Sequence, residues 1–198
     1  QKIIAEENKT LSNIEIKQAF QGSVIIGDSI TEGVLIDAFL SDERIDQKNR
    51  PAQDDVTATY AYLTAVHLGL KPVIMGYGAV GITKSGCGSV PKVSEAYPYN
   101  FSGSKAKPQN PDIIVINHGA NDARSDEKEY IEGYWSFLTL VREMNPNAKI
   151  IVLSAFCGAF HESLGEMVTR FNRQTGDDVI YIDSFGWIPA DPLHPLRD

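Results

Sequence analysis

Apolar residues in this chain gather into short runs that are separated by longer amphipathic or polar stretches. The runs are mostly β-branched, and each is followed by a glycine, a polar or a small residue: Ser23–Ile26, Pro72–Met75, Ile113–Ile116, Ile150–Leu153 and Val179–Ile182. Uninterrupted apolar runs of this length are typical of strands that are buried on both faces, as in a parallel sheet. The pattern therefore predicts five strands at the centre of a domain.

Between the runs, apolar positions recur every three or four residues, which is the period of an amphipathic helix. The stripe predicted within residues 55–70 is Val56, Tyr60, Leu63, His67 and Leu70. The stripe predicted within residues 126–144 is Tyr130, Tyr134, Phe137, Leu138, Val141 and Met144. Ser125 is the expected N-cap of this second helix, and a third helix is expected over residues 161–174.

Alternating strands and helices predict a five-stranded parallel sheet with helices on both faces, a three-layer α/β/α sandwich. Catalytic groups in such folds gather at the carboxyl ends of the strands. Residues 34–54 and 87–111 are predicted to be long loops. Residues 1–21 are expected to form a leader helix or a linker, and residues 22–198 the domain itself.

Composition narrows the class of protein. The 198 residues are 42% hydrophobic and carry a formal net charge of -8, without a concentrated basic patch. These values indicate a folded domain and argue against nucleic-acid and anionic-membrane partners. No apolar stretch is long enough to span a bilayer. The sequence begins with Gln1, so a removed secretion signal, and with it an extracellular or periplasmic location, stays open.

The two cysteines are too few for a disulfide framework. Cys87 and Cys157 follow the second and fourth predicted strands. In the strand order 2-1-3-4-5 these strands would lie about 14 Å apart, whereas a disulfide needs Cα atoms within about 7 Å. We therefore predict free thiols.

Four polar blocks follow the predicted strands at the edge where catalytic groups gather. They are GDSITEG at residues 27–33, GYGAVG at 76–81, GAND at 119–122 and DPLH at 191–194. Together they supply the parts of serine-dependent acyl transfer: a Ser29 hydroxyl, a His194 base and an Asp191 carboxylate that can orient the imidazole. The Ser29 N–H, a glycine N–H and the Asn121 amide could stabilise an oxyanion. Since His194 must be neutral, activity should fall at acidic pH.

These four blocks, in this order, resemble those of the SGNH (GDSL-type) hydrolase superfamily. The resemblance implies a flavodoxin-like fold, no cofactor, Ser29 as nucleophile, and a triad completed by Asp191 and His194. It also implies an oxyanion hole formed by Ser29, Gly81 and Asn121. Gly81 is preferred to Gly78 because the family glycine falls two residues before a common threonine, here Thr83.

Two features depart from the family pattern. Many members carry asparagine where this chain has Gly76. The family usually continues beyond the DxxH block into a helix, whereas this sequence ends four residues after His194. The sequence therefore predicts a hydrolase domain that lacks a final C-terminal helix.

Other uses of these motifs are less well supported. Residues 76–81 also match G-x-G-x-x-G, but the residues that follow are too rich in glycine and proline to open the helix that a dinucleotide needs. No two histidines have metal-ligand spacing, which argues against a metal site. His67 is expected at the core or its boundary, and His161 as a capping or solvated residue. Asp28 and Asp122 are expected to hold turns.

The activity this resemblance implies is ester hydrolysis through an acyl-enzyme. Aromatic residues in the loops favour removal of a short acyl (acetyl) group from a carbohydrate, so the expected partner is a small-molecule or polysaccharide ester. The residues expected to contact this substrate are His118, Trp187, Tyr97 and Tyr99. Alternatively, His118 packs beneath the site and the tyrosines pin their loop to the body.

The spacing of the blocks is also similar to that of two-domain carbohydrate esterases of the superfamily, whose hydrolase domain follows a β-sandwich. Two other functions stay open. The chain could be a lysophospholipase or thioesterase of the same superfamily, or a catalytically silent carbohydrate-binding module.

Overall fold

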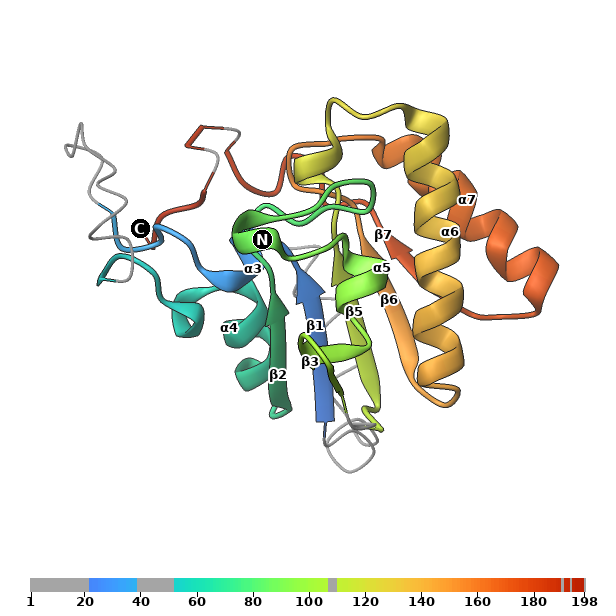
Figure 1. The fold of residues 1–198 in the computed structure, drawn as a ribbon, viewed down its shortest axis with the longest axis horizontal. Helices are drawn as coiled ribbons and strands as arrows, with labels where there is room; N and C mark the ends of the chain where they lie inside the picture. Colours follow the sequence, from blue (N-terminus) through green and yellow to red (C-terminus); the bar gives the residue numbers. More distant parts are fainter. Residues whose placement is uncertain (1–21, 39–51, 107–109, 190, 193, 198) are drawn as a thin grey trace, which may run out of the picture.

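The computed structural model describes residues 22–38, 52–106, 110–189, 191–192 and 194–197. The expected leader or linker at residues 1–21 and much of the first long loop lie outside the described residues. The main sheet has the order β2-β1-β5-β6-β7, and every neighbouring pair is parallel (Figure 1). Its strands are β1 (Gly22–Gly27), β2 (Lys71–Gly76), β5 (Ile113–Asn117), β6 (Lys149–Leu153) and β7 (Ile180–Ile182). The predicted strands and their order are confirmed.

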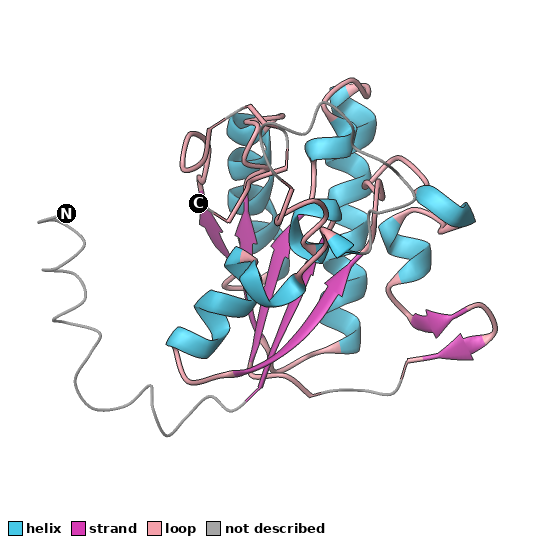
Figure 2. Ribbon diagram, turned by 90° about the vertical axis from the view of Figure 1, so that its left-hand side faces the viewer, coloured by secondary structure: helices cyan, strands magenta, loops and turns pink. Residues whose placement is uncertain are grey.

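Helices cover both faces of the sheet, which makes the predicted three-layer sandwich (Figure 2). One face carries α6 (Glu127–Met144) and α7 (His161–Thr175), and the other carries α4 (Tyr60–His67). The short helices are α3 (Ser29–Glu32), α5 (Val93–Ala96) and the 3-10 turns η2 (Val56–Ala58), η3 (Cys87–Ser89) and η4 (Ala120–Asp122). None of the described helices combines the length and apolarity needed to cross a membrane.

The larger hydrophobic core lies between the sheet and α6 with α7. The stripe predicted for α6 is buried, apart from Met144, which is partly buried: Tyr130, Tyr134, Phe137, Leu138 and Val141. The N-cap of α6 is Asp126 rather than Ser125, because the Asp126 carboxylate accepts the Glu129 N–H at 2.9 Å. The Ser125 hydroxyl instead hydrogen-bonds to the Thr83 hydroxyl.

The stripe predicted within residues 55–70 is wrong at three of its positions, one of which is Val56 of η2, 37% exposed. Helix α4 buries Ala61 and Ala65 against the sheet, while Leu63 is 54% exposed and His67 is also exposed. Both faces of α4 carry apolar residues at helical spacing, and the alanines allow the closer approach to the sheet. The large side chains of Leu63 and His67 therefore point outward, away from Ile25 of β1.

The second long loop contains local structure. Besides η3 and α5 it holds an antiparallel hairpin of β3 (Tyr99–Phe101) and β4 (Ser104–Lys105). Figure 1 shows this hairpin in front of the lower half of the sheet, away from the carboxyl ends of the strands. Cys87 and Cys157 are free, as predicted, and both are exposed.

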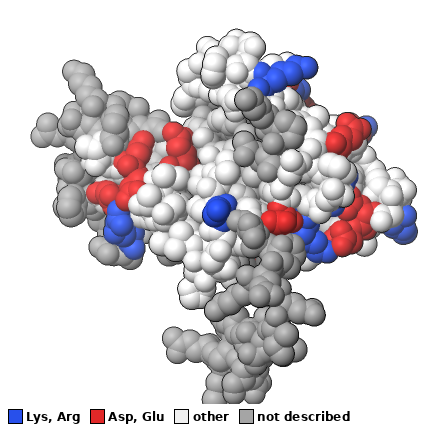
Figure 3. All heavy atoms as spheres, turned by 90° about the horizontal axis from the view of Figure 1, so that it is seen from below, with Lys and Arg blue, Asp and Glu red and all other residues white. Residues whose placement is uncertain are grey.

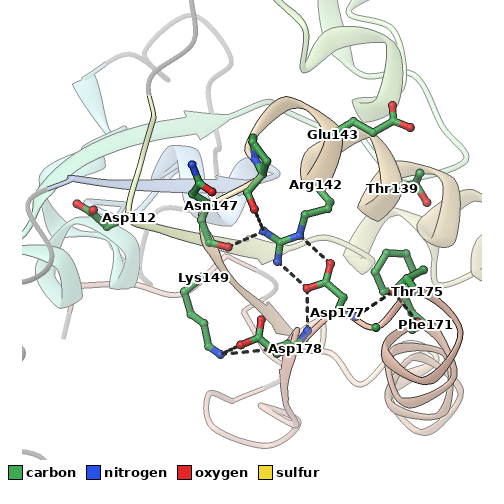
Figure 4. Close-up of a pocket in the computed structure, with 13 residues that line it drawn as sticks. Asp112, Thr139, Arg142, Glu143, Asn147, Lys149, Phe171, Thr175, Asp177 and Asp178 are labelled. Carbon is green, nitrogen blue, oxygen red and sulfur yellow. Dashed lines mark hydrogen bonds and ion pairs between the residues drawn. The ribbon is translucent and has the colours of Figure 1, made fainter.

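The amino end of the sheet is held by an ion pair beside a surface cavity of about 620 Å³ (Figure 4). The Arg142 guanidinium donates from Nε and Nη2 to the two Asp177 carboxylate oxygens, each at 2.7 Å. Its Nη1 donates to the Ala148 carbonyl at 2.7 Å. Arg142 thereby ties the end of α6 to the turn after α7. Acidic and basic side chains are interspersed on the described surface in the view from below (Figure 3).

Candidate active site

Ser29 is placed at the carboxyl end of β1, at the first position of α3. The preceding Asp28 caps this helix, because its carboxylate accepts the Ile30 N–H at 3.0 Å. The turn also requires glycine at Gly27, where a Cβ would lie 2.0 Å from the Thr31 hydroxyl oxygen. The tight turn leaves Ser29 half-buried, with its hydroxyl at the edge where the loops meet.

His194 approaches Ser29 from the far end of the chain. Its Nε2 lies 2.9 Å from Ser29 Oγ, within hydrogen-bond distance, although 165 positions separate the two residues. A neutral imidazole at this distance can take the hydroxyl proton as a general base. The two groups are therefore in a geometry that suits an activated serine nucleophile.

An arginine anchors the segment that carries His194. The Arg197 guanidinium donates to both Asp37 carboxylate oxygens, at 2.6 and 2.9 Å, and to Asp55 Oδ2 at 2.7 Å. The Arg197 N–H donates to the Ile36 carbonyl at 2.9 Å. These contacts join the end of the chain to the elements that follow α3, on the side of the nucleophile.

Asp191 lies on the surface three residues before His194. Among the hydrogen bonds of the described residues, none joins its carboxylate to the His194 ring. Its place as the third member of a triad stays a prediction.

Two of the expected oxyanion donors are available. The Ser29 N–H is the first of α3 and has no acceptor within the helix. The Asn121 amide donates to the Val80 carbonyl at 3.0 Å, and a primary amide has a second N–H to offer. The Gly81 N–H, in contrast, donates to the Lys84 carbonyl at 2.9 Å. The Gly81 role stays a prediction that requires this N–H to leave or share its present acceptor.

Asp122 joins the loop that follows β2 to the loop that follows β5. Its buried carboxylate accepts from the Ile82 N–H at 2.9 Å and from the Thr83 N–H and hydroxyl at 2.8 and 2.7 Å. Its oxygens also explain why residue 81 is glycine, since a Cβ there would lie 2.6 Å from the carboxylate. Asp122 therefore fixes the loop after β2 against the loop after β5. The sequence predicted that Asp122 holds a turn but did not predict its partners Ile82 and Thr83.

Burial shifts the pKa of two further groups at this edge. Burial raises the pKa of Asp28 to about 7, mainly because the carboxylate loses its contact with solvent. The nearby charge of Asp122 raises this pKa further. Burial lowers the pKa of His118 to about 4. Both groups are thus disfavoured in their charged forms.

The residues expected to contact substrate lie in different environments. His118 is fully buried, and its ring nitrogens make no hydrogen bond of good geometry among the described residues, although the Val80 backbone lies nearby. Tyr97 is 5% exposed, and its hydroxyl accepts from the Asn145 amide at 2.8 Å. These positions match the alternatives in which His118 packs beneath the site and Tyr97 pins its loop.

Tyr99 and Trp187 are both accessible but lie in different places. Tyr99 belongs to the hairpin away from the carboxyl edge of the sheet. Trp187 is 63% exposed on the segment that leads from β7 to His194. Phe185, on the same segment, is 56% exposed and was not singled out from the sequence.

No group of three or more histidine, cysteine, aspartate or glutamate side chains in the described ranges is arranged to hold a metal ion. His161 is partnered, because its Nδ1 lies 3.0 Å from Asp183 Oδ2. The pairing differs from the capping role that the sequence suggested for His161.

A parallel α/β/α sandwich that brings a serine after its first strand to a histidine near its end has the SGNH hydrolase fold. The chain belongs to the GDSL-like lipase/acylhydrolase family, whose model matches residues 25–196. Family membership places it among the carboxylic ester hydrolases.

Solved structures with this fold include several carbohydrate esterases. A family two carbohydrate esterase from Clostridium thermocellum, in complex with cellohexaose, is 22% identical with a TM-score of 0.73, over 89% of this chain and 59% of that one. An acetyl xylan esterase from the rumen bacterium Butyrivibrio proteoclasticus is 21% identical with a TM-score of 0.74, over 89% and 59% of the two chains.

A putative arylesterase from Agrobacterium tumefaciens is 13% identical with a TM-score of 0.59, over 89% of this chain and 91% of that one. The chain spans about three fifths of the length of the carbohydrate esterases it resembles. No curated protein matches the sequence.

Proposed function

We propose that this protein is a serine ester hydrolase that removes short acyl groups, acetyl above all, from a carbohydrate. The observation that carries the proposal is the 2.9 Å separation between Ser29 Oγ and His194 Nε2. The acidic chain, with a net charge of -8, suits a neutral acylated sugar better than a polyanion.

In the first half of the proposed reaction, His194 Nε2 takes the hydroxyl proton while Ser29 Oγ bonds to the ester carbonyl carbon. The carbonyl oxygen becomes an oxyanion that the Ser29 N–H and the second Asn121 N–H stabilise. His194 then gives its proton to the departing sugar oxygen as the ester bond breaks, which leaves an acyl group on Ser29.

In the second half, His194 takes a proton from water as the water oxygen bonds to the acyl carbon. The bond to Ser29 Oγ breaks, the serine regains the proton, and the carboxylic acid leaves. Asp191 is proposed to orient the imidazole through these steps. Every step uses groups of the chain and water.

Support for a carbohydrate comes from the segment that leads to His194. Trp187 presents an exposed aromatic ring there, and the apolar face of a sugar ring packs well on such a surface. Solved structures with the same fold include an enzyme described as an acetyl xylan esterase and another bound to cellohexaose.

A second candidate is a lysophospholipase or thioesterase. An apolar cavity of about 440 Å³ favours it, because an acyl chain is an apolar ligand. The cavity is lined by Leu70 and Phe156, together with Trp187 and Ile188 of the segment that leads to His194.

Ester chain length separates these candidates. We expect wild type to hydrolyse p-nitrophenyl acetate faster than p-nitrophenyl octanoate and to release acetate from acetylated xylan, with both activities lost in Ser29→Ala. Ser163→Ala, which alters a serine on α7, is the matched control and should stay active. A preference for octanoate would favour the second candidate. Absence of hydrolysis on all esters, together with saturable sugar binding, would favour a catalytically silent carbohydrate-binding module.

A further inference from the structure

Phe185 presents an aromatic ring whose position is fixed although the ring is 56% exposed. The ring rests on the backbone of Gly158, where an added Cβ would lie 2.5 Å from a ring carbon. Gly158 also has a φ of +78°, which favours glycine. The His161 ring packs beside it, with the two ring centroids 4.9 Å apart.

The Asp183 carboxylate holds both Phe185 and His161 in place. One carboxylate oxygen accepts the Phe185 N–H and the Ser154 hydroxyl, both at 3.0 Å. The other lies 3.0 Å from His161 Nδ1. The Phe185 N–H is the largest cause that holds the pKa of Asp183 below its usual range, and the His161 contact adds to it. The carboxylate thus holds both the backbone of Phe185 and the ring of His161.

These contacts leave a particular surface. Because Nδ1 of His161 faces Asp183, Nε2 is the ring nitrogen that can meet an outside partner, and the side chain is 25% exposed. The exposed ring of Phe185 lies beside it. An apolar aromatic face next to a hydrogen-bonding group is the chemistry that binds a sugar ring, whose C–H face stacks while its hydroxyls need polar partners.

The place of this surface in the fold connects it to the active site. Phe185 and Trp187 belong to the segment that runs from β7 to His194, and Figure 1 shows this segment crossing the carboxyl side of the sheet toward α3. His161 begins α7, which follows the carboxyl end of β6. A chain-like substrate at Ser29 could therefore extend along this edge.

We propose that Phe185 and His161 form a sugar-binding subsite that holds a unit of an oligosaccharide other than the one that carries the scissile ester. A pyranose ring stacks on Phe185, and one of its hydroxyls hydrogen-bonds to His161 Nε2. The subsite rests on the proposed function and extends it, since it makes the substrate an oligomer or polymer. Because the ring is already fixed, little conformational entropy is lost when the sugar binds.

The test compares a small ester with an oligomeric one. In Phe185→Ala we expect KM for acetylated xylo-oligosaccharides to rise about tenfold, with kcat little changed. Hydrolysis of p-nitrophenyl acetate should match wild type, because that ester does not reach the subsite. Phe185→Trp should keep the low KM, and His161→Ala should raise it less. Phe101→Ala, which removes a ring that is 71% exposed on the β3–β4 hairpin, is the matched control and should behave as wild type.

Three results would overturn the subsite. An unchanged oligosaccharide KM in Phe185→Ala, with p-nitrophenyl acetate still hydrolysed, removes the subsite and leaves the hydrolase standing. An equal loss on both esters would show that Phe185 supports His194 instead. If wild type hydrolyses no ester, the proposed function fails, and calorimetric titration with unacetylated xylohexaose and cellohexaose decides the subsite. Saturable binding that Phe185→Ala weakens supports it, and absence of binding to wild type contradicts it.

Discussion

The Asn121 amide has one observed hydrogen bond and one proposed contact, with an oxyanion. One N–H is held by the Val80 carbonyl at 3.0 Å, which orients the amide so that the other can face an oxyanion. In a ground-state ester this second contact is weak, and it strengthens as charge develops on the carbonyl oxygen. The residue should therefore affect the rate of the chemical step more than substrate binding.

We predict that Asn121→Ala lowers kcat for p-nitrophenyl acetate by about 10²- to 10³-fold with little change in KM. Steady-state kinetics on the purified variant measures both. Asn147→Ala, which removes an exposed asparagine at the opposite end of the sheet, should be unaffected. An unchanged kcat in Asn121→Ala would mean that other groups stabilise the oxyanion.

Asp28 makes stability depend on pH in an unusual direction for a carboxyl group. Its pKa in the folded state is about 7, above its ordinary value of 3.8, because burial disfavours the charge. Between these values the folded state holds a proton that the unfolded state has released. The protonated Asp28 carboxyl therefore stabilises the fold in full below the ordinary pKa of 3.8, and this stabilisation is lost as pH rises through about 7.

We predict that wild type loses more stability than Asp28→Asn between pH 4 and 8, by on the order of a few kcal/mol. The neutral amide keeps an oxygen that can accept the Ile30 N–H but has no charge to bury. Chemical denaturation at several pH values measures the difference, in which titration of other groups largely cancels. Parallel stability curves for the two proteins would contradict the shifted pKa.

Motifs that follow the predicted strands are the sequence signal for the proposed site residues Ser29, Asn121 and His194. Ser29 and Asn121 lie in the turns that directly follow β1 and β5, so the parallel topology places both at one edge of the sheet. His194 lies well beyond the end of β7, and the Arg197 contacts help to hold its segment there. Arg197 and Phe185 carry no such signal. Their partners, Asp37 for Arg197 and Gly158 for Phe185, lie far away in the sequence, and only the folded chain brings each pair together.

The contacts of Arg197 with Asp37 and Asp55 hold the segment that carries His194 against the residues that follow α3. Isolated surface ion pairs contribute little to stability. A guanidinium that hydrogen-bonds to two carboxylates, in contrast, restricts the position of the segment that carries it. Displacement of a catalytic group by about 1 Å can cost about 10²-fold in rate. The clamp should therefore affect catalysis more than stability.

We predict that Arg197→Ala lowers kcat about ten- to a hundredfold while the free energy of unfolding changes little. Guanidinium ion added at low millimolar concentration should restore part of the activity, because it can bridge the same carboxylates. Arg173→Ala, which alters an exposed arginine on α7, is the control. Wild-type kcat in Arg197→Ala would show that the segment is held by other contacts.

At the scale of elements, the strands were predictable because a strand buried on both faces needs an uninterrupted apolar run, which few other elements require. The faces of short helices were less predictable. Helix α4 has apolar residues all round, so periodicity alone could not choose between the face with Ala61 and the face with Leu63. The choice depends on how closely the helix can approach Ile25, which is a property of packing.

In the whole molecule, the proposed catalytic groups and the Arg142–Asp177 ion pair lie at opposite ends of the sheet. The proposed catalytic groups lie on the carboxyl side of the sheet, whereas the Arg142 and Asp177 pair lies at the amino end of β6. The sequence allowed the fold class and the catalytic edge to be predicted from the alternation of elements. No pattern in the sequence predicts the Arg142–Asp177 ion pair, whose partners are 35 positions apart.

We predict that Arg142→Met destabilises the protein by about 2 kcal/mol, because it leaves the Asp177 carboxylate and the Ala148 carbonyl without this donor. The melting temperature should fall by about 4–8 °C. Activity of the folded protein on p-nitrophenyl acetate at 25 °C should match wild type. Calorimetry and initial rates test the two halves, and a loss of kcat without a loss of stability would contradict the separation.

In the proposed reaction His194 activates Ser29 as the nucleophile. The most direct measurement is reaction with a fluorophosphonate, followed by mass spectrometry of the peptides. We predict a single adduct on Ser29 of wild type, formed much more slowly in His194→Ala. An adduct on another residue, or equal labelling of Ser29 in both proteins, would contradict activation of Ser29 by His194.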